Sequence, residues 1–216
     1  EFAHLIPGHT RDVGSAGTAY IDDFEATKTN IDIHYPTYWK LASTPTGAGY
    51  DEAVMGNNVD YNKNRALLAW YTVDPIFGHP QSNTPKHIKD DLNAMSDHRT
   101  RIVYEQEVYP NKEVLPNADT KLAVMNLSYY PEERGPYNIS AEEIGVDGKL
   151  TNPKQRWGGI MRKLDNTDFE KANIEYIEFW LMDPFLTNPD VGFEGGDLYI
   201  DLGDVSEDIL RDGKKS

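Results

Sequence analysis

The sequence predicts an all-β fold, a jelly-roll-like two-layer β-sandwich with long loops and one or two short helices. Several short runs are rich in β-branched and aromatic residues and end at Pro, Gly or Asp. Aromatic residues make up 11% of the chain, and 17 Gly and 13 Pro are spread along it without a period. Signals for helices are few, so two sheets packed face to face are the simplest way to bury the strands.

The clearest predicted strand covers residues 174–182, where Ile, Tyr, Phe and Trp surround two Glu. Both of its faces are mostly apolar, which indicates a central strand covered on both sides. Asp183 and Pro184 end it. Four other runs read as strands, and a further one reads as a short strand or a turn. The four are residues 19–24, 66–73, 121–130 and 197–202, and the ambiguous run is residues 156–161.

The remaining segments predict one short helix and two long loops within a single domain that covers residues 1–216. Thr84 and Pro85 precede residues 87–92 and would start the helix. Residues 44–64 and 131–155 are predicted loops, and loops of this length are usually functional or covered by a partner. Because the chain begins on Glu and not on Met, we expect a fragment of a much larger cell-surface protein.

The charge and the cysteine content exclude several classes of function. The net charge of -15 argues against nucleic-acid binding, which needs clustered Lys and Arg. The chain has no Cys, which excludes disulfides, thiolate catalysis and Cys-based metal sites. Glu175 and Glu178 lie an odd number of residues apart, so a strand would send them to opposite faces and not into one catalytic pair. We therefore expect a protein without enzymatic activity.

An acidic run near the start of the chain is a candidate calcium site. Alternation along a strand sends Asp23 and Glu25 to one face, while Phe24 points to the other and enters the core. Calcium prefers such hard oxygen ligands. Asp201 would complete the site if the first and last strands pair. The alternative is an acidic strand end that pairs with Lys or Arg.

Tryptophans offer a second candidate site, because flat aromatic faces stack on sugar rings. Trp70 and Trp180 lie in apolar runs and are expected in the core. Trp39 and Trp157 are the candidates for sugar contacts, although core packing is the more common role of such residues. They are ligand-binding residues only if the chain is a carbohydrate-binding module.

Several long and unusual segments carry a resemblance to a known family. They are residues 1–9, 20–25, 64–71, 127–138, 156–162 and 197–203. Together they resemble the SprA/Sov family of Bacteroidetes cell-surface proteins, the outer-membrane translocon of the type IX secretion system, which some species need for gliding motility. The resemblance covers essentially the whole chain.

The resemblance implies a giant outer-membrane β-barrel with large soluble insertions, of which this chain would be one, outside the lipid. It implies that the partners are other parts of the same barrel, type IX secretion components and secreted cargo proteins. No catalytic residues are implied, and the one cofactor expected is the candidate calcium ion. Residues 22–25 and 199–201 are also similar to carbohydrate-binding jelly-roll modules, so a carbohydrate-binding module of a cell-surface glycan-binding protein is the alternative function.

Overall fold

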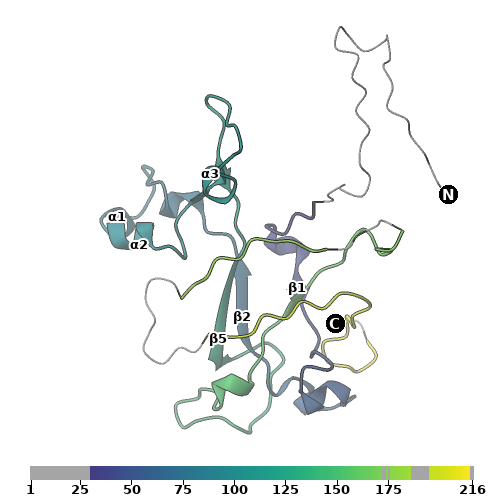
Figure 1. The fold of residues 1–216 in the computed structure, drawn as a ribbon. Helices are drawn as coiled ribbons and strands as arrows, with labels where there is room; N and C mark the ends of the chain where they lie inside the picture. The colour runs from purple at the N-terminus through teal and green to yellow at the C-terminus, as the bar shows by residue number, and fades with distance from the viewer. Residues whose placement is uncertain (1–29, 172–173, 175, 186–194, 215–216) are drawn as a thin grey trace, which may run out of the picture.

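The computed structural model describes residues 30–171, 174, 176–185 and 195–214. It is β-rich, as predicted, with three short antiparallel strand pairs and few helices among these residues (Figure 1). The pairs are β1 (Lys40–Leu41) with β6 (Ile160–Met161), β2 (Ala66–Tyr71) with β5 (Asn126–Arg134), and β3 (Val103–Tyr104) with β4 (Lys121–Leu122). The α-helices are α1 (Lys86–Lys89), α2 (Leu92–Ser96) and α3 (Glu105–Val108). The 3₁₀ helices are η2 (Pro36–Tyr38), η3 (Asp51–Val54), η4 (Val59–Asn62), η5 (Pro75–Phe77) and η6 (Pro153–Gln155).

The longest strand pair is β2 with β5, and it confirms the strand predicted over residues 66–73 as far as Tyr71. The strand predicted over residues 121–130 is in fact two strands, β4 and β5, and Pro131 does not end the second one. Leu67 pairs with Tyr130, but Ala66 pairs with Arg134, so residues 131–133 form a bulge. A bulge tolerates Pro because its residues donate no ladder hydrogen bond.

The pair β1–β6 lies next to the start of β2. The ambiguous run 156–161 contributes β6 and an isolated parallel bridge between Arg65 and Trp157. The Ala66 amide donates to the Trp157 carbonyl (2.8 Å), and the Trp157 amide donates to the Asn64 carbonyl (3.1 Å). These two bonds bring the segments 64–71 and 156–162 side by side.

A small core lies near the start of β2. The buried apolar residues of the described part are Ala53, Tyr61, Ala66, Leu150, Trp157 and Ile209. Residues 44–64, predicted as a long loop, contain η3 and η4 and supply Ala53 and Tyr61 to this core. The segment is therefore packed against the strands.

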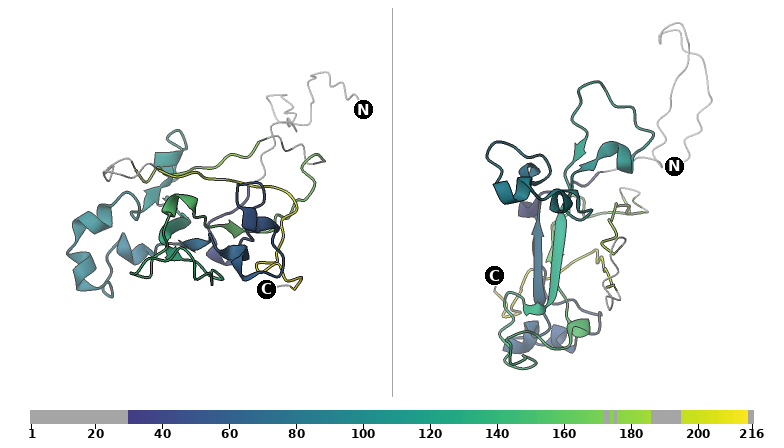
Figure 2. Two further views of the ribbon diagram at one scale, coloured as in Figure 1. Left: turned by 90° about the horizontal axis from the view of Figure 1, so that it is seen from below. Right: turned by 90° about the vertical axis from the view of Figure 1, so that its left-hand side faces the viewer.

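A lobe at the other end of the β2–β5 pair contains η5, α1, α2, α3 and the β3–β4 pair (Figure 2). The short helix predicted after Thr84 and Pro85 is present as α1, followed at once by α2. Thr84 is buried, and its hydroxyl accepts from the Gln81 amide (2.8 Å). No helix within the described ranges combines the length and the apolar character that crossing a membrane requires.

The prediction of a central strand over residues 174–182 is wrong for the residues of this run that the structure describes. None of them belongs to a strand, and all of residues 176–182 are exposed. Residues 197–202 are likewise exposed and outside the strand pairs (Figure 1). A strand requires a hydrogen-bonded neighbour, and the described part of the chain provides none here. The strand predicted over residues 19–24 lies outside the described residues.

Candidate functional site

The structure leaves the calcium site as a prediction. Asp23 and Glu25 lie outside the described residues, and Asp201 is exposed in the segment that follows Gly195. Within the part of the chain that the structure describes, no three His, Asp or Glu side chains form a group that would hold a metal ion.

Trp39 lies in a partly exposed aromatic group at the end of η2. Its indole N–H donates to the Ile33 carbonyl (3.0 Å), and the Arg162 guanidinium lies 5.6 Å from its ring centre and equally far from that of Tyr38. Tyr35 and Tyr38 are 47% and 56% exposed. This group is an aromatic surface of the kind that sugars and extended peptides contact.

Trp157, the other candidate for a sugar contact, is buried. Only 7% of it is exposed, the Arg65 guanidinium lies 4.3 Å from its ring centre, and the Tyr50 ring centre is 6.1 Å away. The structure thus places Trp157 in the core, 118 residues after Trp39, and does not present its ring to solvent. Its visible role is to stack on a buried cation.

Arg65 is the centre of a buried polar cluster that the sequence did not predict as a site. It is 1% exposed, and burial lowers its pKa to about 10. Its Nε and Nη2 donate to Asn62 Oδ1 (3.0 and 2.8 Å), and Nη2 also donates to the Ala42 carbonyl (2.6 Å). Neutral oxygens accept from Nε and Nη2, whereas the buried Nη1 has no hydrogen-bond partner among the described residues. Contacts with neutral, mostly fixed oxygens fit a structural role.

Further polar residues extend the cluster to distant parts of the chain. Asn62 Nδ2 donates to the Ile209 carbonyl (2.9 Å), 147 residues away. Asn138 Nδ2 donates to the carbonyls of Lys63 (2.9 Å) and Arg65 (2.8 Å). Arg156 is 6% exposed and donates to the Thr151 carbonyl, to Asn64 Oδ1 (2.8 Å) and to Glu143. Most of these bonds end on backbone carbonyls, so the cluster fastens loops together.

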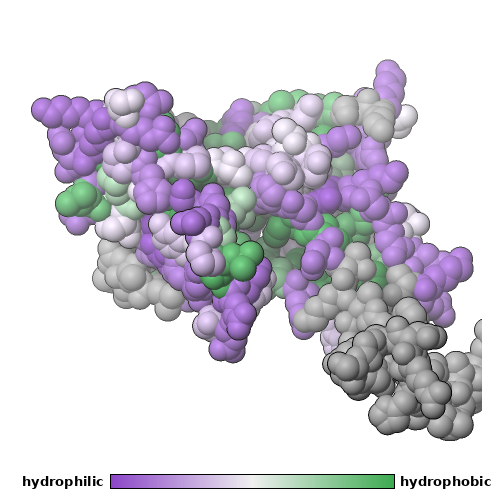
Figure 3. All heavy atoms as spheres, turned by 90° about the horizontal axis from the view of Figure 1, so that it is seen from above, coloured by the Kyte–Doolittle hydropathy of each residue, from purple (hydrophilic) through white to green (hydrophobic). Residues whose placement is uncertain are grey.

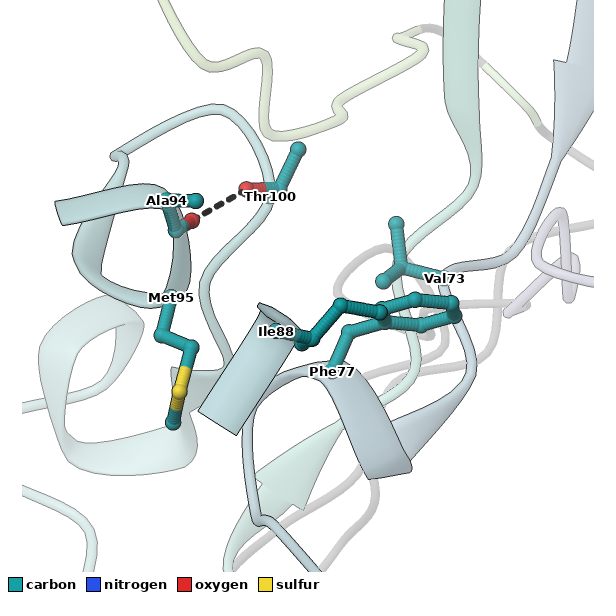
Figure 4. Close-up of a pocket in the computed structure, with 6 residues that line it drawn as sticks. All are labelled: Val73, Phe77, Ile88, Ala94, Met95 and Thr100. Carbon is teal, nitrogen blue, oxygen red and sulfur yellow. Dashed lines mark hydrogen bonds between the residues drawn. The ribbon is translucent and has the colours of Figure 1, made fainter. Parts of the chain in front are cut away.

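An apolar hollow of about 290 Å³ lies in the lobe (Figure 4). Its lining residues are Val73, Phe77, Ile88, Ala94, Met95 and Thr100. The Thr100 hydroxyl donates to the Ala94 carbonyl within the lobe (3.3 Å). The lining carries no ionisable side chain, so the hollow suits an apolar group and not a charged ligand.

Two segments that were predicted as strands expose many apolar side chains. We call Tyr176–Met182 and Leu198–Leu202 together the acidic strip, because Asp and Glu residues alternate with their apolar residues or flank them in the sequence. Its most exposed apolar side chains are Tyr176 (80%), Tyr199 (71%) and Trp180 (70%). Figure 3 shows one face of the molecule, on which hydrophobic side chains lie exposed among hydrophilic ones. Exposed apolar residues that lie close together often mark a contact site.

Comparison with known proteins does not assign the chain to a family. No protein-family model matches it, and no curated protein sequence matches it.

Proposed function

We propose that the chain is a non-catalytic extracellular or barrel-capping domain of an outer-membrane protein-secretion translocon, which supports type IX secretion and gliding motility. The sequence resemblance suggests this role. The observation that carries the proposal is that two of the resembling segments, residues 64–71 and 156–162, meet in one cluster around Arg65 and Trp157. The two segments therefore pack together as parts of one structural unit.

The proposal extends to the fold of the domain and to its location in the cell. A jelly-roll-like sandwich would be completed when the acidic strip acquires neighbours that the described residues do not supply. The domain would stand outside the lipid at the cell surface. Its work would be to cover the pore, shape the exit for cargo or dock a partner.

The test is a deletion of the codons for residues 30–214 in the bacterium that carries the parent gene. We expect secretion of type IX cargo and spreading on agar to fall at least about tenfold, while the amount of parent protein in the outer membrane stays the same. The matched control is Gly196→Ala, which adds a methyl group in open space. Normal secretion by a deletion strain with normal protein levels would contradict the proposal.

The partly exposed group of Tyr35, Tyr38 and Trp39 favours the alternative of a carbohydrate-binding module. Isothermal titration of the full chain with cell-surface saccharides separates the two functions. Saturable binding that Trp39→Ala abolishes would support the alternative, and the absence of heat with every saccharide would support the translocon domain.

A further inference from the structure

The acidic strip has the composition of strands but lies outside the three strand pairs of the described residues. Every described residue from 176 to 185 and from 195 to 207 is exposed, and neither segment takes part in the three strand pairs. Along Tyr176–Met182 both alternating faces are open: Tyr176 and Trp180 on one, Ile177 (48%) and Leu181 (67%) on the other. The pattern that predicted a central strand therefore needs two neighbours and side-chain contacts on both faces.

The strip and the residues that follow it contact the lobe. The rings of Trp180 and Tyr109 make an edge-to-face contact at 6.1 Å between centres, and a His98 ring nitrogen lies 3.3 Å from the Pro184 carbonyl oxygen. These contacts position the segment along the molecule and leave most of its apolar surface exposed.

The part of the sequence that contains the strip carries side-chain charge of one sign. Residues 174–210 contain ten carboxylates and no Lys or Arg, so they carry most of the net charge of -15. The ten are Glu175, Glu178, Asp183, Asp190, Glu194, Asp197, Asp201, Asp204, Glu207 and Asp208. A second copy of the chain would bring the same ten charges and be repelled, and anionic lipid or nucleic acid would be repelled as well.

We infer that the acidic strip binds an extended segment of another protein, and that this segment carries Lys or Arg. The segment would pair with the strip as an added β-strand. Backbone hydrogen bonds would supply affinity, the exposed aromatic side chains would pack on alternate residues of the partner, and the carboxylates would select a basic one. The inference rests on the proposed role as an interaction domain and names the chemistry of its partner.

The test uses the full chain and three synthetic peptides of about nine residues, the length of a strand. One alternates Val with Lys, the second alternates Val with Glu, and the third keeps the Lys but carries Pro at two Val positions. We expect the Val–Lys peptide to bind at least about tenfold more tightly than either of the others, and to slow amide exchange in residues 176–182. Binding should weaken as salt rises.

Matched variants locate the site. The double variant Asp197→Lys, Asp201→Lys should bind the Val–Lys peptide at least about tenfold more weakly than the unchanged chain does. Asp165→Lys with Glu170→Lys makes the same change in net charge at exposed positions outside the strip and should leave affinity within about twofold.

Three outcomes would overturn the inference. Equal binding of the Pro-bearing and Val–Lys peptides would mean general charge attraction, as would equal weakening by the two variant pairs. Self-association that protects residues 176–182 would mean that a second copy is the partner. If none of the three peptides binds, the inference of a basic-strand partner is wrong. The deletion experiment described above tests the secretion role separately.

Discussion

Asn138 shows how one buried side chain fastens distant parts of this chain. It is 3% exposed, and its amide group donates to two backbone carbonyls more than 70 residues earlier, those of Lys63 and Arg65. A buried carbonyl without a partner loses its hydration and gains nothing in return. The bonds of Asn138 therefore matter more for stability than those of an exposed side chain.

We expect Asn138→Ala to lower the free energy of unfolding by about 1–3 kcal/mol, because two hydrogen bonds to buried carbonyls are lost. Each carbonyl keeps one longer bond (3.2 Å), from Arg156 Nη1 to Lys63 and from the Gly135 amide to Arg65. Urea denaturation followed by Trp fluorescence measures the change. Asn93→Ala, at an exposed position of α2, is the control and should change stability by less than about 0.5 kcal/mol. An Asn138→Ala midpoint equal to that of the wild-type chain would show that solvent replaces the amide.

The roles of several residues could not be predicted from the sequence. The Arg65 cluster joins residues that lie up to 147 positions apart, and no local pattern reports such a meeting. The runs 66–73 and 156–161 were predicted from local pattern and the segments 64–71 and 156–162 carried the family resemblance, but neither observation showed that they meet. Trp157 was weighed as a sugar contact and as a core residue, and the sequence held no signal to choose between them, because burial depends on which segments pack over the ring.

At the scale of elements, the contact between β2 and the end of β5 depends on a glycine. An added Cβ on Gly135 would lie 2.3 Å from the Ala66 carbonyl oxygen, which is backbone and cannot move aside alone. The Gly135 amide also donates to the Arg65 carbonyl (3.2 Å). Only a residue without a side chain lets the two backbones approach this closely.

Gly135→Ala should accordingly separate β2 from β5 and reduce stability by about 1–3 kcal/mol. Thermal unfolding by circular dichroism is the measurement. Gly196→Ala, which meets no atom within 4 Å, should leave the melting temperature unchanged within error. If the two variants melt at the same temperature, the strands have room to adjust.

Local sequence predicted elements well where each element had its own partner. β2 formed within the predicted run 66–73, in which Trp70, Tyr71, Thr72 and Val73 favour a strand, and α1 began after Thr84 and Pro85. The prediction that Pro131 ends the strand over residues 121–130 was wrong. Pro131 lies in a bulge, where the missing backbone N–H breaks no hydrogen bond between the strands. Residues 176–182 have strong strand character but stay outside every described pair, since strand formation is decided by neighbours and not by composition.

At the scale of the whole molecule, stability should be unevenly distributed. The β2–β5 pair is the longest hydrogen-bonded strand pair of the described residues and the Arg65 cluster is buried, whereas the acidic strip is exposed. Native-state hydrogen exchange of the chain alone should show slow exchange for amides of residues 67–71 and fast exchange, by at least about a hundredfold, for residues 176–182. Mass spectrometry of peptic fragments resolves the two regions. Similar protection in both would mean that the strip is already paired in solution.

The long reach of the Asn62 amide also has a consequence for the order of events during synthesis. Its acceptor, the Ile209 carbonyl, leaves the ribosome 147 residues later, which is roughly 7–30 seconds at ordinary elongation rates. Until then the segment with η3 and η4 lacks this bond, and the nascent chain carries an incomplete core. Contacts so distant in sequence also slow folding. Completion of this core therefore waits until Ile209 has been synthesised, and a chain that stops before Ile209 would leave the ribosome without the bond from Asn62.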